Sequence, residues 1–218
     1  TYAVMYGGLL YTTATETTLL FGAEPVLIAL LARLVLGEHL RSAQGVGMML
    51  GLIGVYLVVF QGLAPRFEGT VAANAVVSAA MLFEAYASVL GKRLTGRYPG
   101  LMVAAVEMLV GSVLLVPFAI RELVTHGGFA LGLSEWAAVA YLTLICSALC
   151  YGVWYALLSR HTVSSMAAFL FIQPLMGPVL SYVLLKETLG GWSILGGLLV
   201  ILGVALVVRT PATRAEAA

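Results

Sequence analysis

Glutamates inside long apolar segments are the residues of this chain best placed to do chemistry. Glu107 lies eight residues into the apolar segment 99–119, and Glu84 lies within the preceding one. An ionisable group at the centre of a bilayer costs about 2.5 kcal/mol or more, so it is a functional candidate by default. A carboxyl there suits a proton-coupling site or an anchor for a substrate amine, with Glu84 either helping Glu107 or meeting Lys92 and Arg93. The alternative for Glu107 is a protonated side chain that joins neighbouring helices by a hydrogen bond.

Two prolines interrupt apolar segments, and each follows a polar residue. Pro25 follows Glu24, and Pro174 follows Gln173. A proline lacks the N–H of a helix interior and frees a carbonyl four residues earlier. In lipid such a carbonyl is tolerated where it lines a cavity or finds a partner. We therefore expect the prolines to act as hinges and the polar residues before them to lie near a central binding site. Kinks without substrate contact are the alternative.

Aromatic and amide side chains form a second set of pathway candidates. Tyr151 and Tyr155 are four residues apart and share a helix face, and Tyr6 repeats their position earlier in the chain. Such a stripe can enclose an organic substrate by stacking or cation–π contact, or it can form an interfacial belt. Tyr155 lies near the inner end and suits the belt, whereas Tyr151 lies deeper. Asn74 and Ser78, four residues apart, form a small polar face that could line a path or simply pack.

Other noticeable residues have a structural interpretation. Cys146 and Cys150 lack a second pair for a metal site and are expected as small core residues, so we predict no metal and no cofactor. Glu38 and Glu187 end their segments and should cap the next helix or pair with nearby cations. Six glycines lie in apolar segments without the Lys-Ser/Thr ending of a nucleotide loop, which favours close helix packing. They are Gly47, Gly51, Gly54, Gly196, Gly197 and Gly203.

Composition defines the elements that must position these residues. The chain is 61% hydrophobic and 10% charged, with a mean hydropathy of +1.04, whereas a soluble domain is roughly 25% charged. Sustained strand-like alternation is missing from the sequence, so helices rather than a barrel should satisfy the backbone in lipid. We predict an all-α, polytopic membrane protein. Eight segments are expected to span, at 2–12, 16–36, 44–62, 70–90, 99–119, 136–158, 163–185 and 190–208.

The distribution of charge predicts the orientation in the membrane. A net charge of +1 gives no support for nucleic-acid binding. Placing the C-terminus in the cytoplasm puts eight cations at the inner face and three outside, a bias that short loops carry reliably. We expect a multi-pass protein of the cell membrane, with an outer loop at 120–135 and a disordered tail after Val208. The outer cations are Arg66, Arg121 and Lys186, and the inner ones are Arg33, Arg41, Lys92, Arg93, Arg97, Arg160, Arg209 and Arg214.

The chain nearly repeats itself at a shift of 149 positions, which superposes Pro25 on Pro174 and Glu38 on Glu187. The two proline segments are five spans apart, an odd number, so the repeats are expected to be inverted in the membrane. We predict that 1–62 is the C-terminal part of a first repeat, 63–69 an inter-repeat loop, 70–208 a complete second repeat and 209–218 a cytoplasmic tail. By comparison with the second repeat, the first lacks about 80 residues, so the chain is expected to be a fragment.

Both copies resemble the EamA-type repeat of the drug/metabolite transporter superfamily. The resemblance lies in EPVLIALLARLVLGEHL followed by GVGMMLGLIGVYLVV, and in QPLMGPVLSYVLLKETLGGWSILGGLLVILGVALVV, and it covers the chain from 1 to 208. It implies ten helices in two inverted five-helix repeats, and movement of small metabolites, amino acids or toxic compounds, often outward. It implies no particular substrate. Glu107 departs from the family pattern, in which a neutral polar residue often takes this place.

Three classes of function follow. The first is a secondary transporter working by alternating access, with the bilayer, a small-molecule substrate and protons as partners. The second is an intramembrane enzyme, which the sequence disfavours because it contains no Asp and places His39, His126 and His161 at segment ends or in loops. The third is a non-transporting membrane partner, such as a lipid-flippase subunit or a sensor.

Overall fold

Helices form nearly all of the structure, a computed structural model that describes residues 11, 14–61, 70–126, 132–186, 190–210 and 213–214. Within these residues, seven helical segments are long and apolar enough to cross a membrane. The all-α, polytopic class is therefore confirmed. The predicted segment 2–12, apart from residue 11, and the predicted loop 63–69 lie outside the described residues.

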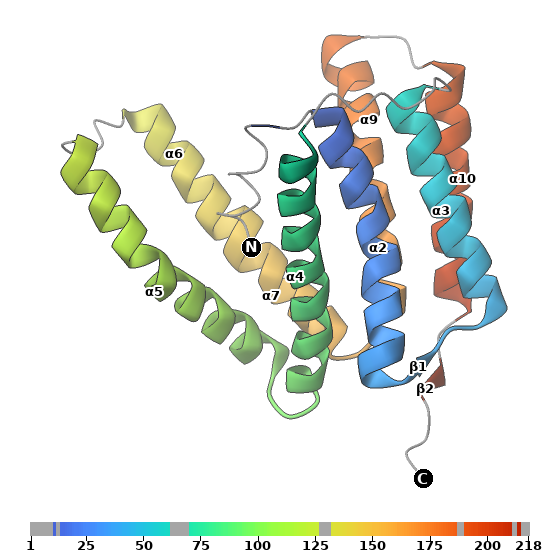
Figure 1. Ribbon diagram of the computed structural model, residues 1–218, viewed down its shortest axis with the longest axis horizontal. Helices are drawn as coiled ribbons and strands as arrows, with labels where there is room; N and C mark the ends of the chain where they lie inside the picture. The colour runs from blue at the N-terminus through green and yellow to red at the C-terminus, as the bar shows by residue number, and fades with distance from the viewer. Residues whose placement is uncertain are drawn as a thin grey trace. The chain divides into compact units, whose positions relative to one another are not determined.

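Figure 1 labels most of the elements, and their full order along the chain is as follows. They are α2 (Ala14–Leu36), β1 (Glu38–His39), α3 (Ser42–Phe60), α4 (Val71–Thr95), α5 (Gly100–His126), α6 (Leu133–Tyr141), a π-helix η1 (Leu142–Leu149), α7 (Cys150–Leu158), α8 (Val163–Ala168), a 3₁₀ helix η2 (Phe169–Ile172), α9 (Gln173–Leu185), α10 (Gly191–Arg209) and β2 (Thr213–Arg214). The chain divides into two compact units, one of residues 1–90 and 162–218 and the other of 91–161, which are described separately.

Glycines let α3 and α10 of the first unit pack with their backbones in contact. A Cβ atom on Gly47 would lie 2.7 Å from the carbonyl oxygen of Gly203, and one on Gly54 would lie 2.5 Å from that of Gly196. Real Cβ atoms do not come so close, so this approach depends on glycine. The predicted close packing is confirmed at these four glycines and is wrong for Gly197, where an added Cβ would meet nothing within 4 Å.

Phe171 of η2 fills the centre of the first unit. Its side chain is fully buried, and its ring lies where a Cβ on Gly51 of α3 would be. The rest of this core comes from α2, α3, α8 and α10, so Phe171 ties these helices together. Its buried members are Ala29, Met48, Val55, Ala168, Val200, Val204 and Val207.

The two prolines affect their spans differently. Pro25 lies inside α2, which stays helical from Ala14 to Leu36. Pro174 follows the 3₁₀ turn of η2 and is the second residue of α9, where a helix start needs no N–H donor. Their hinge role stays a prediction, but the change of helix type before Pro174 is the kind of feature that marks hinges.

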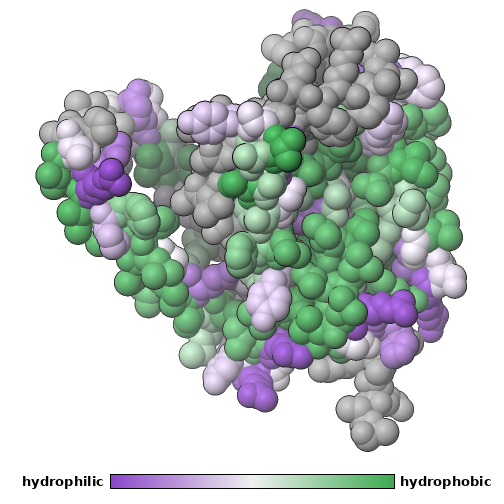
Figure 2. Space-filling model, in the orientation of Figure 1, coloured by the Kyte–Doolittle hydropathy of each residue, from purple (hydrophilic) through white to green (hydrophobic). Residues whose placement is uncertain are grey.

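The helices of the second unit are longer than predicted. Helix α5 runs to His126 and α6 begins at Leu133, so the predicted loop 120–135 is too long: Glu122 and Glu135 belong to terminal helical turns. A helix satisfies its own backbone hydrogen bonds and can continue beyond the hydrocarbon. Most side chains of α5, α6 and η1 are apolar and exposed, as on surfaces that face lipid. Figure 2 shows hydrophobic residues over most of the visible surface, with hydrophilic ones gathered toward its ends.

The span that contains the predicted core cysteines includes a π-helix. The N–H of Cys150 donates to the carbonyl of Ile145, five residues earlier, and the hydroxyl of Ser147 donates to the carbonyl of Leu142 at 3.0 Å. Both Cys146 and Cys150 are exposed, so their expected core position is wrong. A thiol behaves as a small hydrophobe and is tolerated on an apolar surface.

The predicted disordered tail pairs with the chain at one point. Strand β2, Thr213–Arg214, pairs antiparallel with β1, Glu38–His39. The expected disorder is therefore wrong for Thr213 and Arg214. The extended backbone of β1 offers N–H and C=O groups that need hydrogen-bond partners, and β2 supplies them.

Candidate functional site

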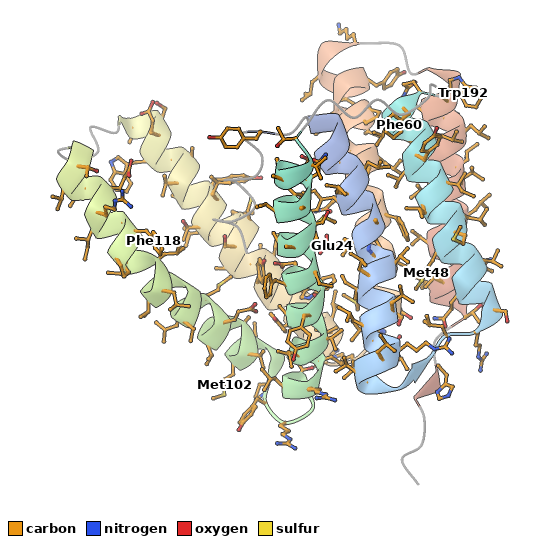
Figure 3. The ribbon with its side chains drawn as sticks, in the orientation of Figure 1. Glu24, Met48, Phe60, Met102, Phe118 and Trp192 are labelled. Carbon is orange, nitrogen blue, oxygen red and sulfur yellow. The ribbon has the colours of Figure 1, made fainter. Side chains whose placement is uncertain are left out.

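Two glutamates lie near the middle of spanning helices in the first unit. Glu24 of α2 is only 5% exposed, and Figure 3 shows it on the side of α2 that faces α4. Glu84 of α4 is half-buried, and its carboxyl is close enough to Glu24 for their charges to interact. From the sequence, the segment is predicted to end at residue 90, which would put Glu84 nearer its inner end. In the structure α4 continues to Thr95, so Glu84 lies near the middle of the helix.

The 149-position shift superposes Glu24 with Gln173 and Pro25 with Pro174 in this region, and only the first of these pairs differs in burial. Pro25 and Pro174 are both buried, but Gln173 is exposed whereas Glu24 is not. In the described part of the chain, no hydrogen bond or charge interaction joins Gln173 to Glu24. The structure therefore brings Glu24 to Glu84 rather than to its repeat mate.

In the second unit, the structure brings together two other predicted residues, Glu107 and Tyr155. The hydroxyl of Tyr155 donates to Oε2 of Glu107 at 2.5 Å. Tyr155 is 3% exposed, and its ring occupies the space beside Gly91 where a Cβ would lie. The predicted place of Tyr155 in an interfacial belt is therefore wrong, because the missing side chain of Gly91 makes room for its ring. Glu107 is exposed beyond this bond and lies in the first third of α5 rather than at its centre.

Lys92 holds the end of α4 against the end of α7. Its ammonium donates to the carbonyl oxygens of Leu158 at 2.6 Å and His161 at 2.7 Å. Leu158 is the last residue of α7 and His161 lies just beyond it, where a helix leaves its carbonyl acceptors unpaired and favours a positive charge. Lys92 thus positions Tyr155, one turn earlier on α7.

The remaining predicted pathway residues are scattered. Tyr151 of α7 is half-buried, and Asn74 lies half-buried in the first turn of α4, well away from Glu84 in the same helix. Tyr6 lies outside the described residues. Their pathway role stays a prediction.

Glu38 has partners that the sequence does not reveal. Its Oε1 accepts the N–H of Val163 at 2.9 Å, and its Oε2 accepts the N–H of Ser164 at 3.2 Å and the Ser164 hydroxyl at 2.6 Å. The expected cap on the next helix is wrong: Glu38 caps α8, 125 residues along the chain. Helix α3 instead uses Gln44, whose Oε1 accepts the N–H of Arg41 at 3.1 Å. Glu187 lies outside the described residues.

The structure places two sets of candidate polar groups in spanning helices, the Glu24–Glu84 pair and the Glu107–Tyr155 pair. Among the described residues, no group of three His, Cys, Asp or Glu side chains could hold a metal ion. Glu24 is a buried carboxyl near the middle of a helix long and apolar enough to span a membrane; ionisable groups in such positions are functional candidates.

The chain is similar in sequence to a known protein family and in fold to a solved structure. The EamA-like transporter family matches residues 1–60 and 72–209. A solved crystal structure that is 20% identical has the same fold with a TM-score of 0.75, over 94% of this chain and 70% of that one.

Three relatives from microbes are similar over most of the chain. An uncharacterised transporter of Archaeoglobus fulgidus is 30% identical over 94% of this chain and 70% of its own. The probable terminal-alkyne amino-acid exporter of Streptantibioticus cattleyicolor is 32% identical over 96% and 69%. The probable amino-acid metabolite efflux pump of Salmonella typhimurium is 24% identical over 85% and 64%. Together with the seven apolar helices, these matches show that the chain belongs to the EamA-like transporter family and is a membrane transporter of small metabolites; the three relatives are named a transporter, an exporter and an efflux pump.

Proposed function

We propose that this transporter exports amino acids or amino-acid-derived metabolites from the cell in exchange for protons. Two of the relatives are named for amino-acid export, and this supports the substrate class. The proposal places the protein in the cell membrane with its C-terminus in the cytoplasm, two inverted five-helix repeats, and alternating access around a site near the membrane midplane. The transporter names of the relatives fit a protein that is not an enzyme and do not favour a non-transporting partner.

The Glu24–Glu84 pair is the observation that carries this proposal. Two carboxylates that interact in a poorly solvated site repel one another when both are ionised. A bound cation relieves that repulsion, and both a proton and a substrate ammonium meet the requirement. Because they would compete for the same carboxyls, a proton can enter only as the amine leaves. Competition for one site is sufficient to couple export of the amine to import of the proton.

Glu107 and Tyr155 form a second proposed position on the pathway. A carboxylate that accepts a short hydrogen bond from a buried phenol is held in one orientation. We assign it a role in guiding the proton or the amine, with Tyr151, Asn74, Gln173 and Tyr6 as proposed lining residues and Pro25 and Pro174 as proposed hinges.

Flux through the full-length protein in proteoliposomes tests the proposal. A pH gradient should drive counter-transport of radiolabelled amino acids, and Glu24→Gln and Glu84→Gln should each reduce this flux at least tenfold. Glu135→Gln, at an exposed glutamate outside the pair, is the control and should transport normally. Pair variants that keep pH-driven flux would refute the coupling site, and a protein that moves none of the amino acids would refute the substrate class. The flux of Glu107→Gln, measured from pH 5.5 to 8, tests the proposed role of Glu107. An unchanged transport rate and an unchanged pH profile would refute that role.

A further inference from the structure

Four basic side chains lie at one end of the second unit, and we call them the basic patch. They come from the last turn of α4, from the turn between α4 and α5, and from the two residues that follow Ser159 after α7, and all four are exposed. The sequence has no acidic residue from 85 to 106 or from 136 to 186, so the patch and the turns beside it carry no negative side chain. The patch consists of Arg93, Arg97, Arg160 and His161.

The packing of α5 against α7 brings the two sides of the patch together. A Cβ atom on Gly100, at the start of α5, would collide with the carbonyl oxygen of Tyr155 in α7. Arg97 precedes Gly100 by three residues, and Arg160 follows Tyr155 by five. Both arginines therefore lie at the same end of two neighbouring helices, where Figure 1 shows the turn between α4 and α5.

Lys92 prepares this end of the unit for an anion. Carbonyl oxygens at the end of a helix carry a partial negative charge, which would repel a phosphate. The ammonium of Lys92 covers them by donating to the carbonyls of Leu158 at 2.6 Å and His161 at 2.7 Å. In the described part of the chain, the guanidinium groups of Arg97 and Arg160 have no ion-pair or hydrogen-bond partner of their own. Lys92 thus serves the helix end, and the two arginines are available to a ligand.

The side chains that adjoin the patch are those of a membrane surface. Leu94, Leu101 and Leu157 lie in the neighbouring helical turns and are 46%, 66% and 41% exposed. Tyr98, in the same turn as Arg97, is also exposed, and tyrosine is common at the depth of lipid headgroups. A soluble anion would use only the cations, whereas a phospholipid would cover the leucines with its acyl chains as well. Arginine also binds phosphate through two parallel N–H donors.

We propose that the basic patch binds the headgroup of an anionic phospholipid. The phosphate lies between Arg97 and Arg160, and the acyl chains lie along the exposed leucines. Clusters of basic residues beside membrane-spanning helices attract anionic lipids in this way. The bound lipid joins the turn before α5 to the end of α7, and so it steadies the helix that carries Tyr155. The proposed orientation places the lipid in the cytoplasmic leaflet, but binding itself depends on neither the substrate nor the coupling to protons.

Native mass spectrometry of the full-length protein in a neutral detergent tests this proposal. Phosphatidylglycerol should bind about tenfold more tightly, or better, than phosphatidylcholine with the same acyl chains. Arg97→Gln and Arg160→Gln should each weaken the binding of phosphatidylglycerol about fivefold, and the double variant should weaken it further. The matched controls are Arg33→Gln and Arg209→Gln, which remove exposed cations predicted at the same membrane face but outside the patch. Neither control should change the affinity.

Two further arms separate a lipid site from other sources of attraction. Arg160→Lys keeps the charge and should retain most of the affinity that Arg160→Gln loses. Glycerol 3-phosphate, which has the phosphate without acyl chains, should not displace phosphatidylglycerol at equal concentration. Unchanged affinity in both Arg97→Gln and Arg160→Gln, equal losses in the controls, or displacement by glycerol 3-phosphate would overturn the proposal. Because the measurement involves no transported substrate and no pH gradient, these outcomes are independent of the flux results.

Discussion

Replacing Gly54 with Ala tests how strongly the α3–α10 contact depends on the missing side chain. A Cβ at this position would lie 2.5 Å from the carbonyl oxygen of Gly196 and 2.7 Å from Cγ2 of Val200, whereas ordinary contact begins at 3.4 Å. Backbone on the partner helix cannot rotate away as a side chain can. The two helices must therefore separate by roughly 1 Å, and a gap of 0.5–1 Å forfeits a quarter to a half of the dispersion attraction of each contact.

The expected loss of stability is about 1–3 kcal/mol, the usual cost of overpacking a filled core. The closely packed residues beside the contact, Val55, Val58 and Val200, are buried and would share the gap. Part of this cost is offset because alanine favours a helix over glycine by about 1 kcal/mol.

Reversible unfolding of the purified protein in mixed micelles, followed by tryptophan fluorescence, measures the effect. Gly197→Ala is the matched control, because its new Cβ would meet nothing within 4 Å and only the helix preference remains. We expect Gly54→Ala to destabilise and Gly197→Ala to stabilise slightly. Equal effects of the two substitutions would refute the steric account of the contact.

Three further predictions concern single contacts and use the same unfolding assay. Gly37→Ala should cost about 1–2 kcal/mol through its φ of +67° alone, since its surroundings are open; Gly37→Asn should recover part of this, and equal losses would argue against backbone strain. Lys92→Met should cost about 2 kcal/mol by uncapping α7, whereas Arg97→Met, at an exposed cation nearby, should cost far less. Tyr155→Phe keeps the ring beside Gly91 and loses the bond to Glu107; a double-mutant cycle with Glu107→Gln should give a coupling of about 0.5–3 kcal/mol, and zero coupling would contradict that bond.

The sequence predicts best what depends on regular local patterns. The length of the apolar segments locates the spans. The missing side chains at Gly47 and Gly54 predict a close contact with another helix, but the sequence does not identify that helix as α10. The polar residue before Pro25 identifies Glu24, but its neighbour Glu84 lies on another helix, so the pairing could not be read from spacing. Helix ends are predicted least well, because hydropathy falls at the headgroups while the backbone stays helical, as at Thr95.

Long-range polar contacts escaped prediction for a different reason. Glu38 looks like a local cap because its nearest helix start is α3, and only the fold shows that Val163 is closer in space. Tyr155 looks interfacial because it lies near a segment end, and the room that Gly91 leaves for its ring is visible only in three dimensions. In both cases the deciding neighbour is more than 60 residues away in the chain.

The wide turns of η1 have a consequence for the helix that follows. In a π-helix each hydrogen bond spans five residues rather than four, so Leu142–Leu149 holds extra chain length inside an otherwise regular span. One residue corresponds to a rotation of about 100° around a helix of 3.6 residues per turn. Because the wide turns take up this extra residue, a change of Leu142–Leu149 to a regular α-helix at unchanged length would turn Tyr155 away from Glu107 by up to that angle. Deleting one residue together with that change would largely keep the facing of α7, so this facing depends on the conformation of η1 as well as on the number of its residues.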